Sequence, residues 1–460
     1  MNAIITIDPA TGEELGRYPG LDAPALDASL QRAADAQRTW REVPVEQRVE
    51  PLRRLATLLR DEAQTHAELI SREMGKPVTE ALAEVRKCAV TCDYYADRAA
   101  EFLAQQPVET EASASFVAYE PLGVVLAVMP WNFPYWQVIR FAAPTLAAGN
   151  GGLLKHASNV TGSAIALESL FQRAGFPEGL FQTLVLTDHG MVDEIIADPR
   201  VAAVTLTGSE AAGASVATAA GRALKKTVLE LGGSDPFVVL ADADVEKVAP
   251  LAVRARFVNT GQSCLCAKRF PVEAGVIEDF ERRVGDLVEA LRIGDPLDPA
   301  TQIGPLAKPS FVDDIDRQVR ESVALGARVV TGGHRLDGPG NYYAPTVLAD
   351  VTPDMPVFRE ETFGPVMAIV RAESADEAIE LADDTRYGLA ASVWTADMER
   401  GLRLGRGIRS GALFVNSVVV SDPRLPFGGV KLSGYGRELS REGMLEFTNI
   451  RAVWAMESVA

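Results

Sequence analysis

The run Val124-Val-Leu-Ala-Val-Met129 is the first of several short apolar stretches that alternate with helical stretches in the middle of the chain. Apolar runs of this length are typical of strands that are buried on both faces, and their alternation with helices is typical of parallel βαβ units. The pattern predicts an α/β fold with a nucleotide-binding sheet. Further strands of this sheet are expected at 152–155, 181–186, 202–207 and 227–231.

A second alternating series begins after Asp235 and predicts a second α/β domain. Connectors rich in Pro and Gly at 294–309 and 332–345 are expected to be loops within this domain. Its strands are expected at 236–240, 269–272, 327–330 and 366–370, and a helix is expected at 277–291.

The segments that flank these two series have different patterns. From Pro24 to about Gln106, apolar residues recur at helical spacing, which predicts several amphipathic helices. Residues 109–120 alternate as in an exposed strand, and residues 447–456 also predict a strand. Because exposed strands often pair with another chain, both segments are candidates for a contact between subunits.

Charge and apolar content limit the partners of the chain. Its 460 residues include 45 Lys and Arg against 63 Asp and Glu, and the net charge of -18 disfavours nucleic acid and anionic membranes. No apolar run approaches the roughly 20 residues of a membrane helix. Residues Met1 to Ile5 lack the features of a signal peptide. We therefore expect a cytoplasmic protein that binds neither nucleic acid nor membrane.

The cysteines and histidines do not predict a disulfide framework or a metal site. Cys88 and Cys92 are spaced as on one face of a helix, so we expect both to be buried. The four histidines share no metal-ligand spacing, and we expect no metal. They are His66, His156, His189 and His334.

Two segments carry residue types that suit covalent catalysis. Asn259-Thr-Gly-Gln-Ser-Cys264 places a thiol beside a Gly-containing turn, about thirty residues after Leu229-Glu-Leu-Gly-Gly233. A thiolate attacks an electrophilic carbon, and a carboxylate such as Glu230 activates water. Together the two segments predict an enzyme whose covalent cycle ends in hydrolysis.

Three further features suit a nucleotide and a developing oxyanion, and each has a simpler explanation. Leu206-Thr-Gly-Ser209 opens a helix that contains Gly213, so its backbone N–H groups suit a phosphate, although an ordinary strand-to-helix turn also explains it. Lys155 suits a ribose or a phosphate, or is a solvated lysine. Pro130-Trp-Asn-Phe-Pro134 is a rigid turn that can aim the amide of Asn132 at an oxyanion, or Asn132 caps its own turn.

Six motifs occur in the order seen in the NAD(P)-dependent aldehyde dehydrogenases, which the chain resembles over nearly its whole length. Three other stretches, at 154–157, 231–237 and 267–270, are more specifically similar to the short bacterial succinate-semialdehyde dehydrogenases. The six motifs are Pro130–Pro134, Leu206–Ser209, Leu229–Gly233, Gly261–Cys264, Glu360–Pro365 and Pro426–Gly429.

The resemblance implies a role for each catalytic residue. Cys264 forms a thiohemiacetal with the aldehyde, and its thiol pKa, about 8.5 when unperturbed, is expected to be lowered by its surroundings. The Asn132 side chain and the Cys264 backbone N–H hold the oxyanion. Glu230 then activates the water that cleaves the thioester. Glu438 matches a carboxylate that assists Glu230 or a proton path, although a surface helix cap explains it equally well.

The resemblance also implies a dinucleotide site and no metal. Lys155 and Glu361 would bind ribose hydroxyls, Phe363 would pack near the nicotinamide ribose, and Gly208 with Ser209 would approach the pyrophosphate. Many relatives that prefer NAD carry Glu where this chain has Ser158, so we expect NADP to be accepted, alone or alongside NAD. The remaining cofactor contacts would be Trp131, Gly213 and Leu231.

Fewer residues indicate the substrate, for which we expect succinate semialdehyde. Arg140 matches a position that offers a guanidinium to the substrate carboxylate, and Ser421 adds a hydroxyl. Val258 departs from relatives that have a second arginine there. Arg140 as an ion-paired helix residue is the alternative, and glutarate semialdehyde or aliphatic aldehydes stay open. Cys266 is either a buried neighbour or the partner of Cys264 in a reversible disulfide.

The family fold implies a Rossmann-type dinucleotide-binding domain (1–107 and 122–233), an α/β catalytic domain (234–431) and a small β arm for oligomerisation (108–121 and 445–460). Residues 432–444 would return the chain to the cofactor domain. A homodimer or homotetramer is expected. The competing functions are a CoA-acylating aldehyde dehydrogenase, a non-catalytic homologue and a cofactor-free cysteine hydrolase. Glu230 disfavours the first, the intact catalytic residues disfavour the second, and the lack of a suitably placed His disfavours the third.

Overall fold

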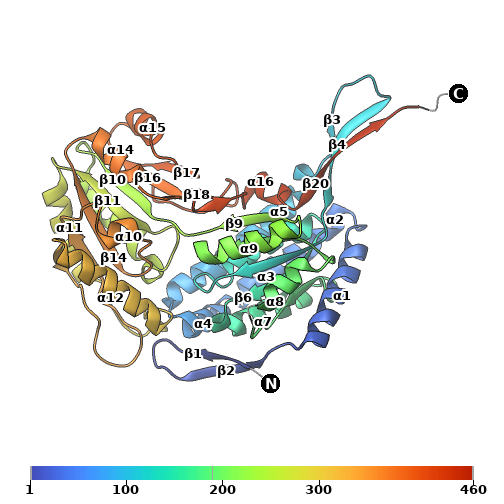
Figure 1. Cartoon of the computed structure of the whole chain (residues 1–460), viewed down its shortest axis with the longest axis horizontal. Coiled ribbons are helices and arrows are strands. Elements are labelled where there is room, and N and C mark those ends of the chain that lie inside the picture. Colours follow the sequence, from blue (N-terminus) through green and yellow to red (C-terminus); the bar gives the residue numbers. More distant parts are fainter. Residues whose placement is uncertain (1–2, 189, 458–460) are drawn as a thin grey trace.

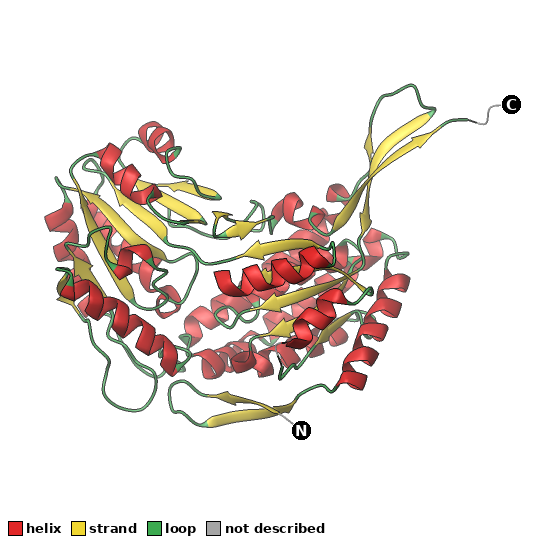
Figure 2. Cartoon of the chain, in the orientation of Figure 1, coloured by secondary structure: helices red, strands yellow, loops and turns green. Residues whose placement is uncertain are grey.

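The computed structural model describes residues 3–188 and 190–457, and these form two α/β lobes with a narrow β arm (Figure 1). Helices pack around a sheet in each lobe, and the arm projects from the lobe that contains the N-terminal half of the chain (Figure 2). The expected α/β class is confirmed. His189 lies outside the described residues.

The first lobe contains a six-stranded sheet in the order β19-β9-β8-β5-β6-β7. Five strands are parallel, and only β19 at one edge runs antiparallel to its neighbour β9. All five apolar runs of the first series form strands, although β7 is shorter than expected. The bounds are β5 Val124–Met129, β6 Gly151–His156, β7 Phe181–Thr183, β8 Val201–Thr207, β9 Lys226–Glu230 and β19 Gly434–Tyr435.

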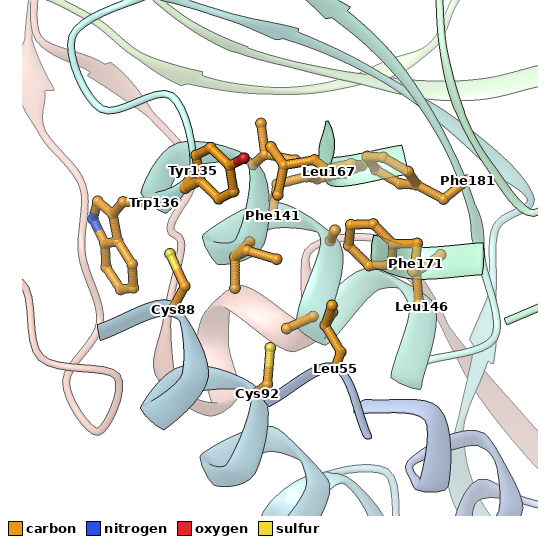
Figure 3. Packing of buried hydrophobic residues seen from close by; sticks show 14 of the residues in the cluster. Leu55, Cys88, Cys92, Tyr135, Trp136, Phe141, Leu146, Leu167, Phe171 and Phe181 are labelled. Atoms are coloured by element: carbon orange, nitrogen blue, oxygen red, sulfur yellow. The ribbon is translucent and has the colours of Figure 1, made fainter. Parts of the chain in front are cut away.

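Helices of the N-terminal segment and of the βαβ units cover this sheet. The expected burial of Cys88 and Cys92 is confirmed, because both side chains on α5 enter the same apolar cluster as Tyr135 and Phe141 (Figure 3). The helices of this lobe are α1 Ala23–Trp40, α2 Val45–Arg48, α3 Glu50–Asp61, α4 Ala63–Met74, α5 Val78–Phe102, α6 Trp136–Ala147, α7 Thr161–Arg173, α8 Gly190–Ala197 and α9 Glu210–Arg222, with the 3-10 turn η1 Ser158–Val160.

The second lobe contains a seven-stranded sheet in the order β12-β13-β14-β11-β10-β16-β17. Its strands are parallel except β12, which pairs antiparallel with β13. The sequence patterns predicted four of these strands and missed β13, β16 and β17. The bounds are β10 Asp235–Val239, β11 Ala267–Glu273, β12 Arg328–Thr331, β13 Thr346–Ala349, β14 Val366–Ala372, β16 Ala390–Trp394 and β17 Ala412–Val415.

The helices of the second lobe cover this sheet in the same way (Figure 2). The expected helix at 277–291 is present as α11. The bounds are α10 Val245–Phe257, η2 Val258–Gly261, α11 Ile277–Glu289, α12 Pro309–Ala324, α13 Pro356–Arg359, α14 Ala375–Asp383 and α15 Met398–Gly405.

The arm is a three-stranded antiparallel sheet in which β20 pairs with β4, and β4 pairs with β3. The expected exposed strand at 109–120 and the expected strand at 447–456 therefore belong to one sheet, while the division of the chain into domains stays a prediction. Along residues 3–188 and 190–457, no helix combines the length and apolar character that crossing a bilayer requires. The remaining elements are β1 Ala3–Ile7, β2 Glu14–Pro19, β3 Gln106–Pro107, β4 Ala114–Pro121, β15 Tyr387–Gly388, β18 Val430–Lys431, α16 Ser440–Leu445 and β20 Thr448–Ala455.

Candidate active site

Cys264 lies in a tight loop that follows α10 and the 3-10 turn η2. Asn259 and Thr260 have φ values of 54° and 55°, in the left-handed region that non-glycine residues seldom adopt. A Cβ atom at Gly261 would lie 2.2 Å from the carbonyl oxygen of Gly364, so only glycine allows this approach to the neighbouring loop. The close packing fixes the turn that presents the thiol.

Two cavities meet at this thiol. The larger has a volume of about 880 Å³ and the smaller about 420 Å³, and Cys264 lines both. The larger cavity also contains Arg140 and Ser421, the two candidate substrate residues. The smaller cavity contains Asn132 and six of the candidate cofactor residues, which are Trp131, Gly208, Ser209, Leu231, Glu361 and Phe363.

The thiol is less acidic than the sequence analysis expected. Burial raises the pKa of Cys264 to about 12, and the positive charges of Lys268 and Arg140 offset only part of this effect. The expectation that the surroundings lower this pKa is therefore wrong for the structure. The thiol must lose its proton during the reaction, because at neutral pH nearly all of it is protonated.

The amide of Asn132 is held by groups outside its own turn. Its Nδ2 donates to the carbonyl of Gln262 at 3.1 Å, and its Oδ1 accepts from Nε2 of Gln137 at 3.0 Å. The structure therefore does not support the alternative that Asn132 caps its own turn. Because an amide nitrogen carries two hydrogens, one N–H of Asn132 stays available. Among the described residues, the backbone N–H of Cys264 has no acceptor either.

Glu230 ends β9 and is 2% exposed. Neither of its carboxylate oxygens has a hydrogen-bond partner among residues 3–188 and 190–457. Burial raises the pKa of Glu230 well above its usual range, and the negative charge of Glu438 adds to this effect. Its side chain packs beside Gly428, where an added Cβ would lie 2.8 Å from Oε1. In this position Glu230 is not among the described residues that line the two cavities.

Arg140 and Glu438 form a buried ion pair. Nε of Arg140 lies 2.5 Å from Oε2 of Glu438, and the side chains are 3% and 6% exposed. Arg140 also donates to the hydroxyl of Thr207 at 3.2 Å. The interpretation of Glu438 as a surface helix cap is wrong. For Arg140, the structure contains the ion pair that was the alternative to a free substrate anchor.

The smaller cavity has the features that a dinucleotide requires. Helix α9 begins at Glu210, and its N-cap residue Ser209 accepts a hydrogen bond from the N–H of Ala212, so the positive end of the helix adjoins the cavity. The ring of Trp131 stacks on Phe311 with the ring centroids 4.8 Å apart, and it meets the edge of Phe363. A helix N-terminus beside an aromatic wall fits a dinucleotide.

The three other candidate cofactor residues, Gly213, Lys155 and Ser158, are not among the residues that line this cavity. A Cβ atom added to Gly213 on α9 would lie 2.6 Å from Cδ2 of Leu231, so the helix packs closely behind the cavity wall. Lys155 is the residue before the last of β6 and is half-buried, and its pKa is lowered by burial and, to a smaller extent, by the charge of Lys308. Ser158 is exposed at the start of η1. Within the described ranges, no three His, Cys, Asp or Glu side chains are arranged to hold a metal ion.

Two buried lysines, Lys268 and Lys76, hold the loops of the site, and the sequence motifs did not predict either of them. Nζ of Lys268 donates to the carbonyls of Gly233 and Cys264 and to Oε1 of Glu361, so it joins the nucleophile loop to the cofactor side. Nζ of Lys76 donates to the carbonyl of Asn132 and pairs with Glu84. The one signal for Lys268 was a charged residue inside the apolar strand at 267–273.

Cys266 is fully buried, two residues beyond the nucleophile. Its Sγ lies 3.5 Å from the carbonyl oxygen of Val258, and both Cys264 and Cys266 are free thiols in the structure. A disulfide between them stays a prediction.

Known proteins resemble the chain over nearly its full length. Residues 2–453 match the model of the aldehyde dehydrogenase family. A probable succinate-semialdehyde dehydrogenase [NADP(+)] from Synechocystis sp. is 52% identical over 98% of this chain and 99% of that protein. A succinate semialdehyde dehydrogenase [NAD(P)+] from Escherichia coli is 48% identical, with coverage of 98% and 97%.

Solved structures extend the match to the fold. A succinic semialdehyde dehydrogenase from Streptococcus pyogenes, solved in complex with NADP+, superposes with a TM-score of 0.96 at 40% identity, covering 99% of this chain and 100% of that one. The resemblance inferred from six ordered motifs is thereby confirmed. This chain belongs to the aldehyde dehydrogenase family.

Proposed function

We propose that the protein oxidises succinate semialdehyde to succinate with NADP or NAD. The observation that carries this proposal is the position of Cys264, where a cavity suited to a dinucleotide meets a larger cavity with cationic side chains. The names of the relatives from Synechocystis, E. coli and S. pyogenes support the same substrate.

In the proposed reaction, the sulfur of Cys264 attacks the aldehyde carbon and forms a thiohemiacetal. The free N–H of Asn132 and the backbone N–H of Cys264 donate hydrogen bonds to the oxyanion that develops. A bound nicotinamide would supply the hydride acceptor. Loss of the hydride leaves a thioester on Cys264.

Glu230 completes the cycle by activating water against the thioester. Its carboxyl group packs beside Gly428 and outside both cavities, so the side chain has to rotate toward Cys264 to do this. A carboxyl group with a raised pKa is a stronger base once it has lost its proton, which suits the removal of a proton from water. Glu438 would receive or relay that proton.

The cofactor proposal includes NADP because Ser158 has no charge to repel a 2′-phosphate. Lys155 and Glu361 would hold ribose hydroxyls, and Ser209 with Gly208 would hold the pyrophosphate at the start of α9. The names of the relatives include NADP(+) and NAD(P)+, which agrees with use of either cofactor.

The cationic side of the larger cavity is the proposed site of the substrate carboxylate. Arg140 and Ser421 both line this cavity. Glutarate semialdehyde and simple aliphatic aldehydes are the alternatives. Transfer of the acyl group to CoA is disfavoured because Glu230 is present to activate water.

We also propose a homo-oligomer assembled through the β arm. Ile450 and Trp454 on β20 are 63% and 57% exposed, which is unusual for apolar side chains on a paired strand. The proposed domains are those of the sequence analysis, with 108–121 and 445–460 as the arm. A cytoplasmic location stays a prediction.

One panel of assays tests the proposed reaction. Purified protein is supplied with succinate semialdehyde, glutarate semialdehyde or butanal, each with NADP or NAD, and formation of reduced nicotinamide is followed. We expect the largest kcat/KM with succinate semialdehyde and turnover with NADP. No turnover with NADP would refute the cofactor proposal, and turnover only after addition of CoA would refute hydrolysis.

A further inference from the structure

Lys87 is a cation in the larger cavity that neither the sequence motifs nor the proposed reaction uses. It lies on α5 and lines the same cavity as Cys264. Its Nζ donates a hydrogen bond to Oγ of Ser421 at 2.5 Å and lies 3.9 Å from the centroid of the Trp136 ring. Figure 3 shows Trp136 beside Cys88, the residue that follows Lys87 on α5.

The other cations of this cavity are paired or exposed. Arg140 is neutralised by its ion pair with Glu438. Arg254 lies on the exposed surface at the end of α10. In the part of the chain that the structure describes, no acidic side chain lies within 4.0 Å of the Lys87 ammonium group. Of the three cations that line this cavity, Lys87 is therefore the one that is largely buried and has no counter-ion among the described residues.

Acidic residues of the cavity are already bound to other groups. Glu84 pairs with Lys76 and accepts hydrogen bonds from the N–H groups of Tyr135 and Trp136. Glu80 accepts from the N–H of Asn259. Neither carboxylate forms an ion pair with Lys87. A buried charge without a partner is costly, so an anion that enters the cavity gains by pairing with it.

The donors at Lys87 suit a carboxylate. An ammonium group has three N–H donors, and only one is used by Ser421. Because the Ser421 oxygen accepts that bond, its own hydroxyl hydrogen is free to donate. Two adjacent donors, one of them charged, match the two oxygens of a carboxylate. Burial lowers the pKa of Lys87 to about 8, so the group is still charged at neutral pH.

We infer that Lys87, together with Ser421, binds the carboxylate of the aldehyde substrate in the larger cavity. This inference rests on the proposed function, in which the substrate carries a carboxylate at the end opposite the aldehyde. It assigns the charged contact to Lys87 in place of Arg140, which is already paired with Glu438.

The test compares kcat/KM for succinate semialdehyde and butanal, two four-carbon aldehydes that differ in the terminal carboxylate. In Lys87→Met we expect kcat/KM for succinate semialdehyde to fall by about 10- to 100-fold, mainly through KM, as for loss of one charged hydrogen bond. Butanal oxidation should change less than about twofold, since Cys264 and Glu230 are untouched. Lys87→Arg should recover part of the preference.

Two control variants separate a direct contact from a general effect of charge. Arg86→Met removes a cation from the exposed face of α5, and Arg254→Met removes one at the exposed edge of the same cavity. Both should keep the wild-type preference for succinate semialdehyde.

A pH profile gives an independent readout. The ratio of kcat/KM for succinate semialdehyde to that for butanal should fall as pH rises above about 8, because Lys87 loses its charge there. The charged and titratable groups around Lys87 are Arg140, Glu84, Cys88 and Asp422, and both substrates experience them equally. The Lys87→Met variant should show a flat ratio.

The outcomes distinguish failure of the proposed substrate from failure of the proposed role of Lys87. A wild type without preference for succinate semialdehyde would overturn the proposed substrate. A wild-type preference that survives in Lys87→Met, or an equal loss with both aldehydes, would overturn the role of Lys87. Succinate inhibition of butanal oxidation tests that role without the semialdehyde, because Lys87→Met should weaken this inhibition by about tenfold or more. Unchanged inhibition by succinate would contradict the contact.

Discussion

Cys264 is half-buried and Glu230 is buried, and both surroundings favour the protonated forms of these side chains. The thiol pKa is raised to about 12 by burial, and the carboxyl pKa is raised by burial and by Glu438. The presence of a thiol and a carboxyl group is therefore not enough to make Cys264 a nucleophile or Glu230 a base. We infer that both must lose protons as the reaction proceeds, and each requirement is measurable by itself.

The thiol predicts an alkylation experiment. In protein freed of cofactor, the rate of Cys264 alkylation by iodoacetamide should keep rising by about tenfold per pH unit up to pH 10 or so, because only the thiolate reacts. The three other cysteines are buried, and Cys264→Ser provides the background rate. A rate that levels off near pH 8 would show that the thiol pKa is not raised.

The carboxyl group predicts a specific kinetic defect. Glu230→Gln keeps the shape of the side chain but removes the base, so steady-state turnover should fall by about 100- to 10,000-fold. One rapid burst of reduced nicotinamide should remain, because thioester formation does not need this base. In the wild type, hydrolysis should rise with pH as Glu230 loses its proton. Loss of the burst together with turnover would contradict a role confined to hydrolysis.

The single-residue roles that sequence indicates are those tied to local motifs. Cys264, Asn132 and Glu230 each lie in a short segment whose residue types suggest the chemistry. Lys268 joins Cys264 to Gly233 and Glu361, 35 and 93 residues away in the chain, and the partner of Lys87 is 334 residues away. Contacts of that kind depend on the folded sheets, so sequence patterns could not predict them.

Helix α9 shows how an element shapes the cofactor side. It packs behind Leu231 so closely that residue 213 has no room for a Cβ atom. The Cβ of any larger residue would press on the Leu231 side chain, which lines the smaller cavity. The glycine therefore affects the proposed cofactor site through the position of the helix, although it does not line the cavity itself.

Gly213→Ala should push Leu231 toward the smaller cavity and weaken NADP binding by about tenfold, which corresponds to about 1.4 kcal/mol. Binding is measured by fluorescence titration. Gly221→Ala on the same helix is the matched control, because no atom lies within 4 Å of its added Cβ. That control should bind NADP normally and gain about 0.5–1 kcal/mol of stability. Equal affinities in both variants would refute the packing argument.

Elements were predictable where the apolar pattern was continuous. β5 has the bounds that its run of six apolar residues predicted, because such a run suits a strand buried on both faces. β16 was missed because Ala390-Ala-Ser-Val-Trp394 is short and contains residues common in other structures. Strand order was beyond the sequence patterns, since local apolar spacing does not specify that β17 pairs with β16.

At the scale of the whole molecule, the two lobes meet at the thiol and the arm extends away from both (Figure 1). The arm joins β3 and β4 to β20, from the opposite end of the chain. Sequence predicted an exposed strand at 109–120 and a strand at 447–456 but could not show that they pair, because local alternation carries no information on partners. Exposed Ile450 and Trp454 suggest that another subunit covers this strand.

The arm predicts a change in assembly. Wild-type protein should have a mass in solution of two or four times the 49.3 kDa chain. The double variant Ile450→Glu and Trp454→Glu should shift toward smaller species, because two charges would replace apolar contact area. Light scattering after gel filtration measures this. Met398→Glu on α15, also at an exposed apolar residue, is the control and should leave the mass unchanged. A wild-type monomer would contradict the oligomer proposal.

The central claim is that Cys264 carries the acyl group until Glu230 activates water to release it. Intact-protein mass spectrometry of Glu230→Gln, after mixing with NADP and succinate semialdehyde, measures this most directly. We predict a stable increase equal to one succinyl group, mapped by proteolysis to Cys264 and removed by hydroxylamine. No adduct, or an adduct on a different residue, would contradict the account.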